Sequence, residues 1–176
     1  MSRGITFDYI RGFADADGTI LKIGYAVYLY NTEKPLLEKI SVFLIAQGIT
    51  NNIREVYRKK PPPNSKTAFV LEIIGMKNLV KYYEKIGFSM DRKHQILTKR
   101  VNIAKDKLKR LEMKNYDFLY DLYWTKNMSS YEIQEKTGVN NKTICKWMND
   151  LGVPRRTMSE ANNNSVSTGR WKGRWK

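Results

Sequence analysis

Cysteine and histidine are almost missing from this sequence, which contains one of each, Cys145 and His94. A single cysteine cannot form an intrachain disulfide, and it rules out a zinc site that needs several thiolates. A single histidine rules out His-rich metal sites and argues against nuclease mechanisms that depend on histidine. We therefore expect neither disulfides nor a thiolate-bound or histidine-rich metal site to organise the protein.

Long hydrophobic runs are also missing. No apolar stretch in the 176 residues reaches the length of a membrane-spanning helix, and Met1-Ser2-Arg3 does not begin a signal-peptide pattern. We therefore expect an intracellular protein of the cytoplasm, the nucleoid or a genome-containing organelle, which is neither secreted nor bound to a membrane.

Acidic residues are scarce relative to basic ones: 17 Asp and Glu stand against 32 Lys and Arg, a formal net charge of +15. The hydrophobic fraction of 41% is that of a folded protein. A folded protein with this charge usually binds a polyanion, most often nucleic acid, and an anionic membrane surface is the rival interpretation. Most of the excess charge falls in residues 1–115, whereas residues 116–158 are nearly neutral.

The first two thirds of the chain alternate helical and strand patterns. Thr6, Thr32 and Ser89 are suited to cap helices. The expected helices cover residues 7–16, 33–47, 76–86 and 90–109, and the expected strands cover 19–31, with a turn near Ile23-Gly24, then 53–59 and 67–74. This order predicts an α+β fold, αββαββα followed by one more helix, with one antiparallel sheet and helices on one face.

After Lys114 the pattern becomes all-helical. We expect helices over residues 116–125, 130–137 and 141–151, followed by a polar, basic stretch that ends in a doubled Gly-Arg-Trp-Lys. We interpret residues 159–176 as a flexible tail, although the Arg and Trp side chains also suit a nucleic-acid-binding arm.

One segment, Tyr9-Ile-Arg-Gly-Phe-Ala-Asp-Ala-Asp-Gly18, carries a chemical signal. Asp15 and Asp17 lie where the negative end of a helix dipole already points, so two carboxylates there are unfavourable unless a cation arrives. Carboxylate and carbonyl oxygens are the ligands that Mg²⁺ prefers. Gly12 and Ala16 are small and four residues apart, which allows a second helix to approach closely.

Residues 10–18 of this segment resemble the signature of the LAGLIDADG homing endonucleases, with Arg11 at a position where alanine is usual. Thr19-Ile20, Asn31-Thr32-Glu33 and Gly87-Phe-Ser-Met-Asp-Arg-Lys93 resemble other parts of the family. The resemblance covers about residues 4–112 and implies the αββαββα endonuclease fold, in which a saddle-shaped sheet binds DNA.

The resemblance also implies roles for individual residues. Asp17 corresponds to the catalytic carboxylate that binds the metal, and Ala16 to a position whose carbonyl can contact it. Asp15 corresponds to the first acid of the motif, which is more structural. Lys93 or Arg92 corresponds to a basic residue that stabilises charge or polarises solvent, and Asn31 or Thr32 to one that organises water. The implied cofactor is Mg²⁺, with Mn²⁺ or Ca²⁺ able to occupy the same site.

The chain contains one copy of the motif, and single-motif members of the family act as homodimers. The dimer helix would use Tyr9, Gly12, Phe13 and Ala16, and the product would be a double-strand break in a near-palindromic DNA site. The strands would lie in the major groove. Candidate residues on the strands and their loops are Lys22, Tyr28, Tyr30, Arg54, Arg58 and Lys66.

Residues 128–154 resemble a helix-turn-helix of the homeodomain type, whose second helix would enter a DNA groove. The residues expected to face DNA are Asn141, Lys142, Thr143, Lys146, Asn149, Arg155 and Arg156. Together these patterns predict an endonuclease domain over residues 4–115, a helix-turn-helix domain over 116–158 and a tail over 159–176.

Three alternatives remain open at the level of sequence. The protein could be a DNA-binding regulator that does not cleave, and Asp17 argues against this because a protein that only binds DNA has no need of it. It could be a maturase that assists the splicing of intron RNA. It could also be a different metal nuclease that pairs Asp17 with Glu72.

Overall fold

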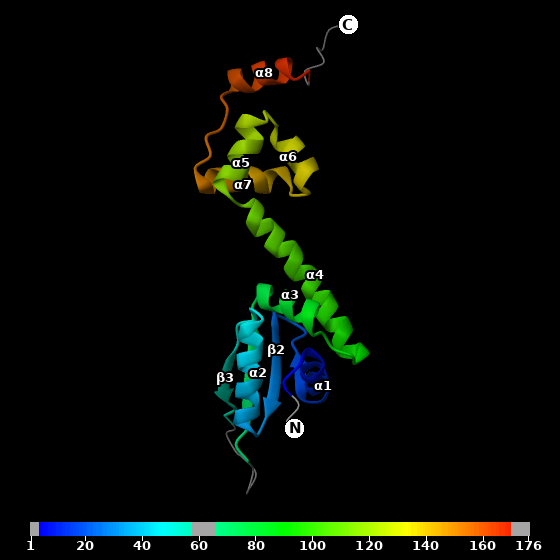
Figure 1. The fold of residues 1–176 in the computed structure, drawn as a ribbon. Coiled ribbons are helices and arrows are strands. Elements are labelled where there is room, and N and C mark those ends of the chain that lie inside the picture. Colours follow the sequence, from blue (N-terminus) through cyan, green and yellow to red (C-terminus); the bar gives the residue numbers. More distant parts are fainter. Residues whose placement is uncertain (1–3, 58–65, 170–176) are drawn as a thin grey trace. The chain divides into compact units, whose positions relative to one another are not determined.

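The computed structural model describes residues 4–57 and 66–169. It divides the chain into two compact units, Met1–Leu108 and Lys109–Lys176. Each unit is described by itself below, and Figure 1 gives the labels of the elements.

The first unit begins with helix α1 (Phe7–Asp17), which continues directly into strand β1 (Gly18–Ile20). The hydroxyl of Thr6 caps α1 by accepting a hydrogen bond from the amide of Tyr9. A Cβ atom on Gly18 would lie 2.4 Å from the carbonyl oxygen of Ala14, so only glycine permits this direct passage from helix to strand. After the turn at Gly24, where φ is +97°, strand β2 (Ala26–Asn31) runs back along β1.

Helix α2 (Lys34–Ala46) leads to strands β3 (Asn52–Glu55) and β4 (Phe69–Ile74). The four strands form an antiparallel sheet in the order β1-β2-β4-β3, which confirms the predicted sheet. In this register Tyr28 pairs with Glu72, and Arg54 pairs with Val70. Figure 1 shows α2 in front of the sheet and α1 beside β2.

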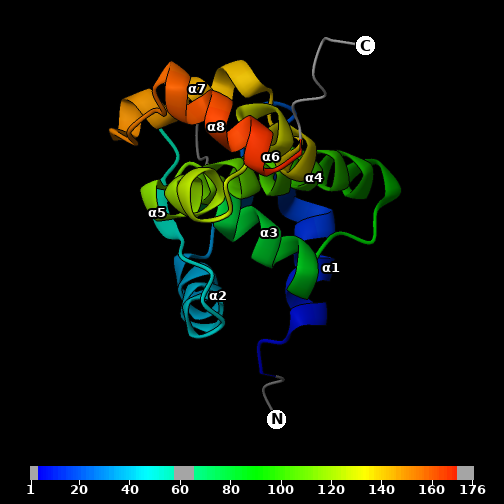
Figure 2. The same cartoon turned by 90° about the horizontal axis from the view of Figure 1, so that it is seen from above.

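Helices α3 (Met76–Lys85) and α4 (Asp91–Met113) complete the unit, and the ion pair between Glu84 and Lys105 joins them. Viewed from above in Figure 2, α1, α2 and α3 are separate helices, and α4 runs past α3. One hydrophobic cluster binds these helices to one face of the sheet. Its members include Ile10, Ala14, Ile20, Val27, Leu29, Leu37, Ile40, Leu44, Leu71, Ile73, Leu79, Tyr82, Leu97 and Val101.

Three local expectations for this unit were wrong. Thr32 does not cap α2, because the helix begins one residue later and the side chain of Asn31 accepts the hydrogen bond from the amide of Glu33. Strand β3 ends at Glu55. Helix α4 continues to Met113 rather than to residue 109. The predicted end of the strand over residues 53–59, and the loop that follows it, lie outside the described residues.

The second unit contains helix α5 (Tyr116–Tyr120), a π-helical turn η1 (Asp121–Thr125), and helices α6 (Ser130–Thr137) and α7 (Asn141–Leu151). Ser129 and Glu132 form a capping box at the start of α6, and Asn140 caps α7. The ranges of α6 and α7 are those that the sequence predicts. A second hydrophobic cluster holds this unit together and comprises Leu119, Leu122, Ile133, Val139, Ile144, Met148 and Val153.

The structure differs from the expected tail. Residues Met158–Ser167 form helix α8, which begins at a capping box of Thr157 and Glu160. The side chain of Asn164 donates a hydrogen bond to the carbonyl of Asn127 (3.1 Å), which ties α8 to the second unit. The sequence contains the capping pattern of Thr157 and Glu160. None of the residues of the helix is buried, so the segment has no apolar periodicity from which a helix would be predicted. Among the described residues, no helix is long and apolar enough to span a membrane.

Candidate active site and DNA-binding surfaces

The side chain of Asp17 stands at the C-terminal end of α1 and is exposed to solvent. In the described part of the chain, no hydrogen bond or ion pair holds its carboxylate. Ala16, immediately before it, is exposed as well. A bare carboxylate at this end of a helix is electrostatically unfavourable, so the arrangement suits a site that receives a cation.

Asp15 has a different surrounding. Its carboxylate accepts hydrogen bonds from the backbone amides of Ser89 (3.1 Å) and Met90 (3.2 Å), immediately before α4. The carboxylate of Asp15 thus caps the start of α4, a role that we expect from the sequence for the side chain of Ser89. The electrostatic argument for a cation therefore does not extend to Asp15, because partners distant in sequence already satisfy it.

Lys93 projects from the first turn of α4 toward the end of α1. Its Nζ atom donates hydrogen bonds to the carbonyl oxygens of Ala14 (2.9 Å) and Asp15 (2.7 Å), and the residue is only 9% exposed. Burial lowers the pKa of Lys93 from its ordinary value, whereas the carboxylates of Asp15 and Asp17 act in the opposite direction. The basic residue expected in the active site thus lies next to it, but its ammonium binds the backbone.

The other candidates for this site are less engaged. Arg92 and Thr32 are exposed, and Asn31 uses its side-chain oxygen at the start of α2. Asn31 lies two residues after Leu29, the partner of Gly18 in the sheet, so it is at the same end of the sheet as the start of β1. The register thereby brings Asn31 near the end of α1.

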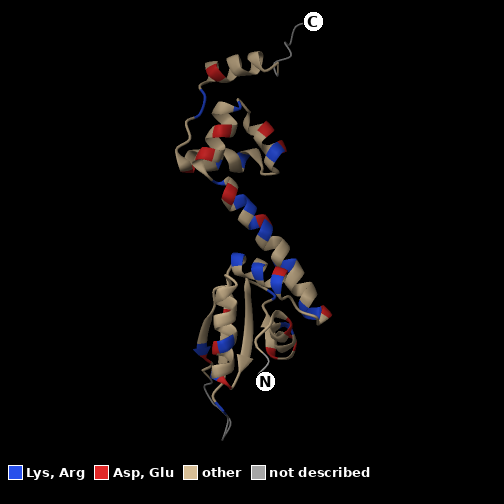
Figure 3. Cartoon of the chain, in the orientation of Figure 1, with Lys and Arg blue, Asp and Glu red and all other residues tan. Residues whose placement is uncertain are grey.

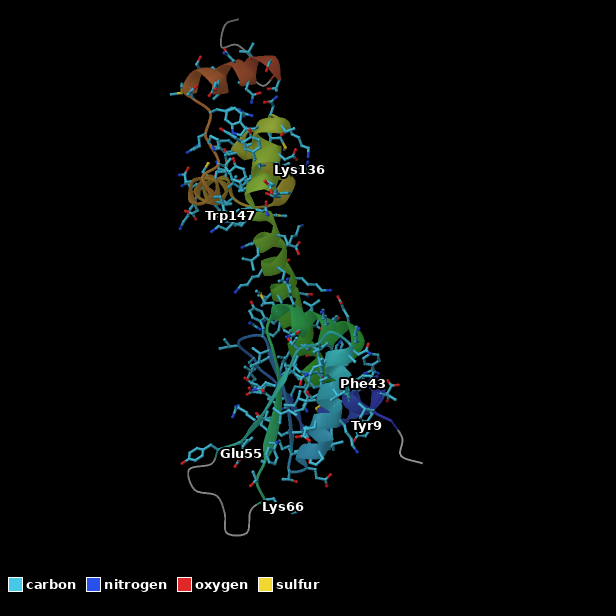
Figure 4. The ribbon with its side chains drawn as sticks, turned by 60° about the vertical axis from the view of Figure 1, so that its left-hand side comes forward. Tyr9, Phe43, Glu55, Lys66, Lys136 and Trp147 are labelled. Carbon is cyan, nitrogen blue, oxygen red and sulfur yellow. The ribbon has the colours of Figure 1, made fainter. Side chains whose placement is uncertain are left out.

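One side of α1 is left open by the first unit. Tyr9 is 42% exposed, Gly12 and Ala16 are exposed, and a Cβ atom on Gly12 would meet no atom within 4 Å. Figure 4 shows Tyr9 on the helical side of the unit, away from Glu55 and Lys66. Phe13 departs from the expected exposed face in part, because it packs against the hydrophobic cluster.

The donor set at the end of α1 fits a hard divalent ion only in part. The carboxylate of Asp17 and the carbonyl of Ala16 are oxygen donors of the kind that Mg²⁺ binds. No group of three or more His, Cys, Asp or Glu side chains that could hold a metal occurs among residues 4–57 and 66–169. For a metal ion bound at this position, the described residues of one chain would supply only part of the ligand set.

The sheet has an outer face, opposite the hydrophobic cluster, that carries polar and aromatic side chains. Alternation along the strands places Tyr28, Tyr30, Arg54 and Glu72 on this face. Tyr30 is 37% exposed on this face. Lys22, in the turn after β1, and Lys66, before β4, are exposed, whereas Arg58 lies outside the described residues.

Arg54 donates a hydrogen bond from Nε to a carboxylate oxygen of Glu72 at 2.7 Å. From the sequence, Glu72 is expected only as a possible metal ligand, and nothing in the sequence predicts this pair. Alternation gives the face of each residue, but the pairing of β3 with β4 is needed to bring them together. The Glu72 side chain is only 11% exposed, and this ion pair gives its carboxylate a partner.

In the second unit, α7 presents a polar side. Lys142, Lys146 and Asn149 are exposed, and Asn141 and Thr143 are half-buried. The side chain of Gln134 on α6 accepts a hydrogen bond from the amide of Asn141 (2.8 Å), which fixes the start of α7 against α6. Figure 4 labels Lys136 on α6 and Trp147 on α7.

Arg155 and Arg156 differ in their surroundings. Arg155 is exposed and lies 3.7 Å from the sulfur of Cys145. The guanidinium of Arg156 donates to the carbonyls of Tyr123 and Met128 and stacks over the ring of Tyr123, 4.3 Å from its centroid. These contacts make Arg156 a structural residue of the second unit, so it is less available to DNA than the sequence suggested.

Residues 5–87 match the family model of the LAGLIDADG-like domain. These residues are thus similar to a LAGLIDADG-like domain. The match contains Asp17 and all four strands of the sheet, whereas Lys93 and the second unit lie beyond it.

Two relatives come from Methanocaldococcus jannaschii. The chain is 26% identical to a probable translation initiation factor IF-2 over 150 residues, which are 82% of this chain and 13% of that protein. It is 30% identical to a replication factor C small subunit over 109 residues, which are 62% of this chain and 6% of that protein. The chain thus resembles only a small part of each relative.

Proposed function

We propose that this chain is a site-specific DNA endonuclease that depends on a divalent metal ion and acts as a homodimer. The observation that carries the proposal is the position of Asp17, exposed and without a described partner at the end of α1, beside the open side of that helix. A domain that only binds DNA has no use for an unpaired carboxylate at the negative end of a helix dipole.

The metal ion would be Mg²⁺, with Mn²⁺ or Ca²⁺ able to replace it, and Asp17 and the carbonyl of Ala16 would hold it. Such an ion supplies Lewis acid chemistry to a phosphodiester, because it neutralises charge on phosphate oxygens and makes a bound water more acidic. Asp17 would hold the ion at the scissile phosphate. Arg92, which is exposed and immediately precedes Lys93 in α4, would stabilise the charge that develops there.

A second copy of the chain would complete the site. The open side of α1 offers Tyr9, Gly12 and Ala16, and the small residues permit two helix backbones to approach closely. A two-fold axis along this contact would bring the two Asp17 carboxylates together. Such a dimer would recognise a near-palindromic site and cut both strands.

The outer face of the sheet would bind the major groove. Tyr28, Tyr30 and Arg54 lie on that face, and Lys22 and Lys66 stand at its turns, where lysines can contact phosphates. Arg54 has a planar guanidinium suited to a guanine edge. Because Glu72 holds Arg54 in the free protein, Arg54 would exchange one partner for another on binding.

The second unit would be a helix-turn-helix that adds a further contact with DNA. The support for this part is the pair of helices α6 and α7 joined by a short turn at Gly138, Val139 and Asn140, with Gly138 in the left-handed conformation. Lys142 and Lys146 on α7 are placed to reach phosphates, and Asn141, Thr143 and Asn149 to reach base edges.

The wider role that we infer is homing, in which the double-strand break moves the gene of an intron or an intein. The matched region forms 13% and 6% of two relatives whose names describe different activities. Two proteins with different named activities each contain a small segment that is similar to this chain. Such a distribution indicates a module that is independent of those activities.

The proposal is tested by incubating the protein with a randomised duplex DNA library and Mg²⁺ and sequencing the ends produced. We expect cuts at one long, near-palindromic sequence. Asp17→Asn should abolish them, and Asp8→Asn, which changes an exposed acid in the first turn of the same helix, should leave them intact. Binding of duplex DNA without cutting would replace the proposal by a regulator, and rescue of intron splicing without DNA cleavage would replace it by a maturase.

A further inference from the structure

The end of α1 and the start of α4 are joined by two sets of hydrogen bonds that run in opposite directions. The carboxylate of Asp15, on α1, accepts from the amides of Ser89 and Met90. The ammonium of Lys93, on α4, donates to the carbonyl oxygens of Ala14 and Asp15. Each helix thus supplies a side chain that bonds to terminal backbone groups of the other, across a sequence separation of more than seventy residues, and the carbonyl of Ala14 also accepts a hydrogen bond from the amide of Gly18.

These contacts have a clear physical reason. The last carbonyls of a helix and the amides before the next one have no partner within their own helix. A cation suits the carbonyl end, and an anion suits the amide end. Because Lys93 is only 9% exposed, its bonds are shielded from water, and breaking them would leave a buried ammonium without acceptors.

The two carbonyls that bind Lys93 come immediately before the candidate metal ligands. Ala14 and Asp15 belong to the last turn of α1, and the next two residues are Ala16 and Asp17. Lys93 therefore fixes the turn from which Asp17 projects while leaving Ala16 out of its hydrogen bonds.

We propose that Lys93 is a positioning residue, which together with Asp15 sets the place of Asp17 and does not itself act on DNA. The expected effect on cleavage rests on the proposed function. The two sets of hydrogen bonds between α1 and α4, which we call the reciprocal lock, can be tested without any substrate. A residue that acted on phosphate or on solvent would need an accessible ammonium. The ammonium of Lys93 instead donates two hydrogen bonds to backbone carbonyls, and it lies 5.7 Å from the centre of the Phe88 ring.

The first test measures amide hydrogen exchange in the protein without DNA. Lys93→Met keeps an unbranched side chain that is one atom shorter and removes the ammonium. We expect exchange at residues 15–19 to accelerate by about tenfold or more, because local opening no longer breaks the two bonds. Lys99→Met, an exposed lysine on the same helix, is the matched control and should leave exchange at these amides unchanged.

The second test separates positioning from direct action by varying Mg²⁺ in the cleavage reaction. Misplacing Asp17 weakens the hold on the ion, so Lys93→Met should raise the half-saturating Mg²⁺ concentration by about tenfold. The rate at saturating Mg²⁺ should recover to within a few fold of the wild-type rate. Lys93→Arg, which keeps a cation, should restore most of the ion affinity.

Several results would overturn the inference. Unchanged exchange at residues 15–19, or a rate that stays low at every Mg²⁺ concentration, would make Lys93 a catalytic residue or a bystander. If Lys93→Met does not fold, Asp15→Asn tests the other half of the lock, and unchanged exchange at Ser89, Met90 and residues 15–19 would contradict the proposal. If no DNA is cut by the wild type, the proposed function fails, and the exchange results still decide whether the lock exists.

Discussion

The Nζ atom of Lys93 lies 2.7 Å from the carbonyl oxygen of Asp15, and the carboxylate of the same Asp15 accepts hydrogen bonds from the amides of Ser89 and Met90, immediately before the helix α4 that carries Lys93. The ammonium of Lys93 and the carboxylate of Asp15 therefore both bind backbone groups beside the candidate site. Asp17 is then the acid of the motif that remains open to an ion. Under the proposed function, the site would depend on one carboxylate per chain and would be completed by a second copy.

The open side of α1 predicts how the dimer can be broken. Gly12→Glu should leave the monomer folded, because an added Cβ meets no atom within 4 Å, but the charged side chain should keep two α1 helices apart. Sedimentation is expected to show a monomer, with loss of double-strand cleavage. Val42→Glu, a matched change at an exposed apolar residue of α2, should leave the dimer intact. A Gly12→Glu protein that still dimerises and cleaves would exclude this interface.

The second unit predicts a salt-dependent contribution to DNA binding. Lys142→Ala and Lys146→Ala should each weaken binding to all sequences and reduce the slope of log affinity against log salt by about 1. Figure 3 colours Lys and Arg blue and Asp and Glu red on the described chain. Fluorescence anisotropy at several salt concentrations measures the slope, and Lys136→Ala on α6 is the control. An unchanged slope in both variants would remove α7 from the DNA-binding surface.

A buried phenol in the first unit predicts a substitution that the fold tolerates. The hydroxyl of Tyr82 is buried and has no hydrogen-bond partner among the described residues, and burial raises the pKa of Tyr82 well above its ordinary value. Tyr82→Phe should therefore leave the free energy of unfolding unchanged or raise it by up to about 1 kcal/mol. Tyr82→Ala should lower the free energy of unfolding by about 3 to 5 kcal/mol because it leaves a cavity in the hydrophobic core. Urea denaturation decides this, and a loss in Tyr82→Phe as large as in Tyr82→Ala would reveal a hidden partner.

Helix α8 predicts a pH dependence. Hydrogen bonds from the backbone amide and the hydroxyl of Thr157 lower the pKa of Glu160 from its ordinary value. The ionised form is thus favoured in the folded helix, so its stabilising effect is full above the ordinary glutamate range and is lost as pH falls through the lowered pKa. NMR titration should show α8 unwinding in that acid range, and Thr157→Ala should shift the pKa of Glu160 back up. A titration of Glu160 at or above its ordinary value would contradict the capping box.

How much of this could be predicted from sequence depended on the distance between partners. Helices α6 and α7 were predicted at their observed bounds because Ser129, Asn140 and Gly138 are local signals. The sheet was predicted because strand patterns and turns are local too. The lock between Asp15 and Lys93, and the pair between Arg54 and Glu72, could not be predicted, because each joins residues that only the folded chain brings together. The division of the chain into domains at residues 115 and 158 stays a prediction.

The most direct test of the central claim uses mixed dimers on the DNA site obtained from the library. Wild-type and Asp17→Asn subunits carrying different tags are combined, and dimers with one of each are purified. Because each subunit would supply one Asp17, the mixed dimer should convert double-strand cleavage into slow cutting or nicking, and the Asp17→Asn homodimer should bind the site without cutting. Double-strand cleavage by the Asp17→Asn homodimer at the wild-type rate would contradict the account.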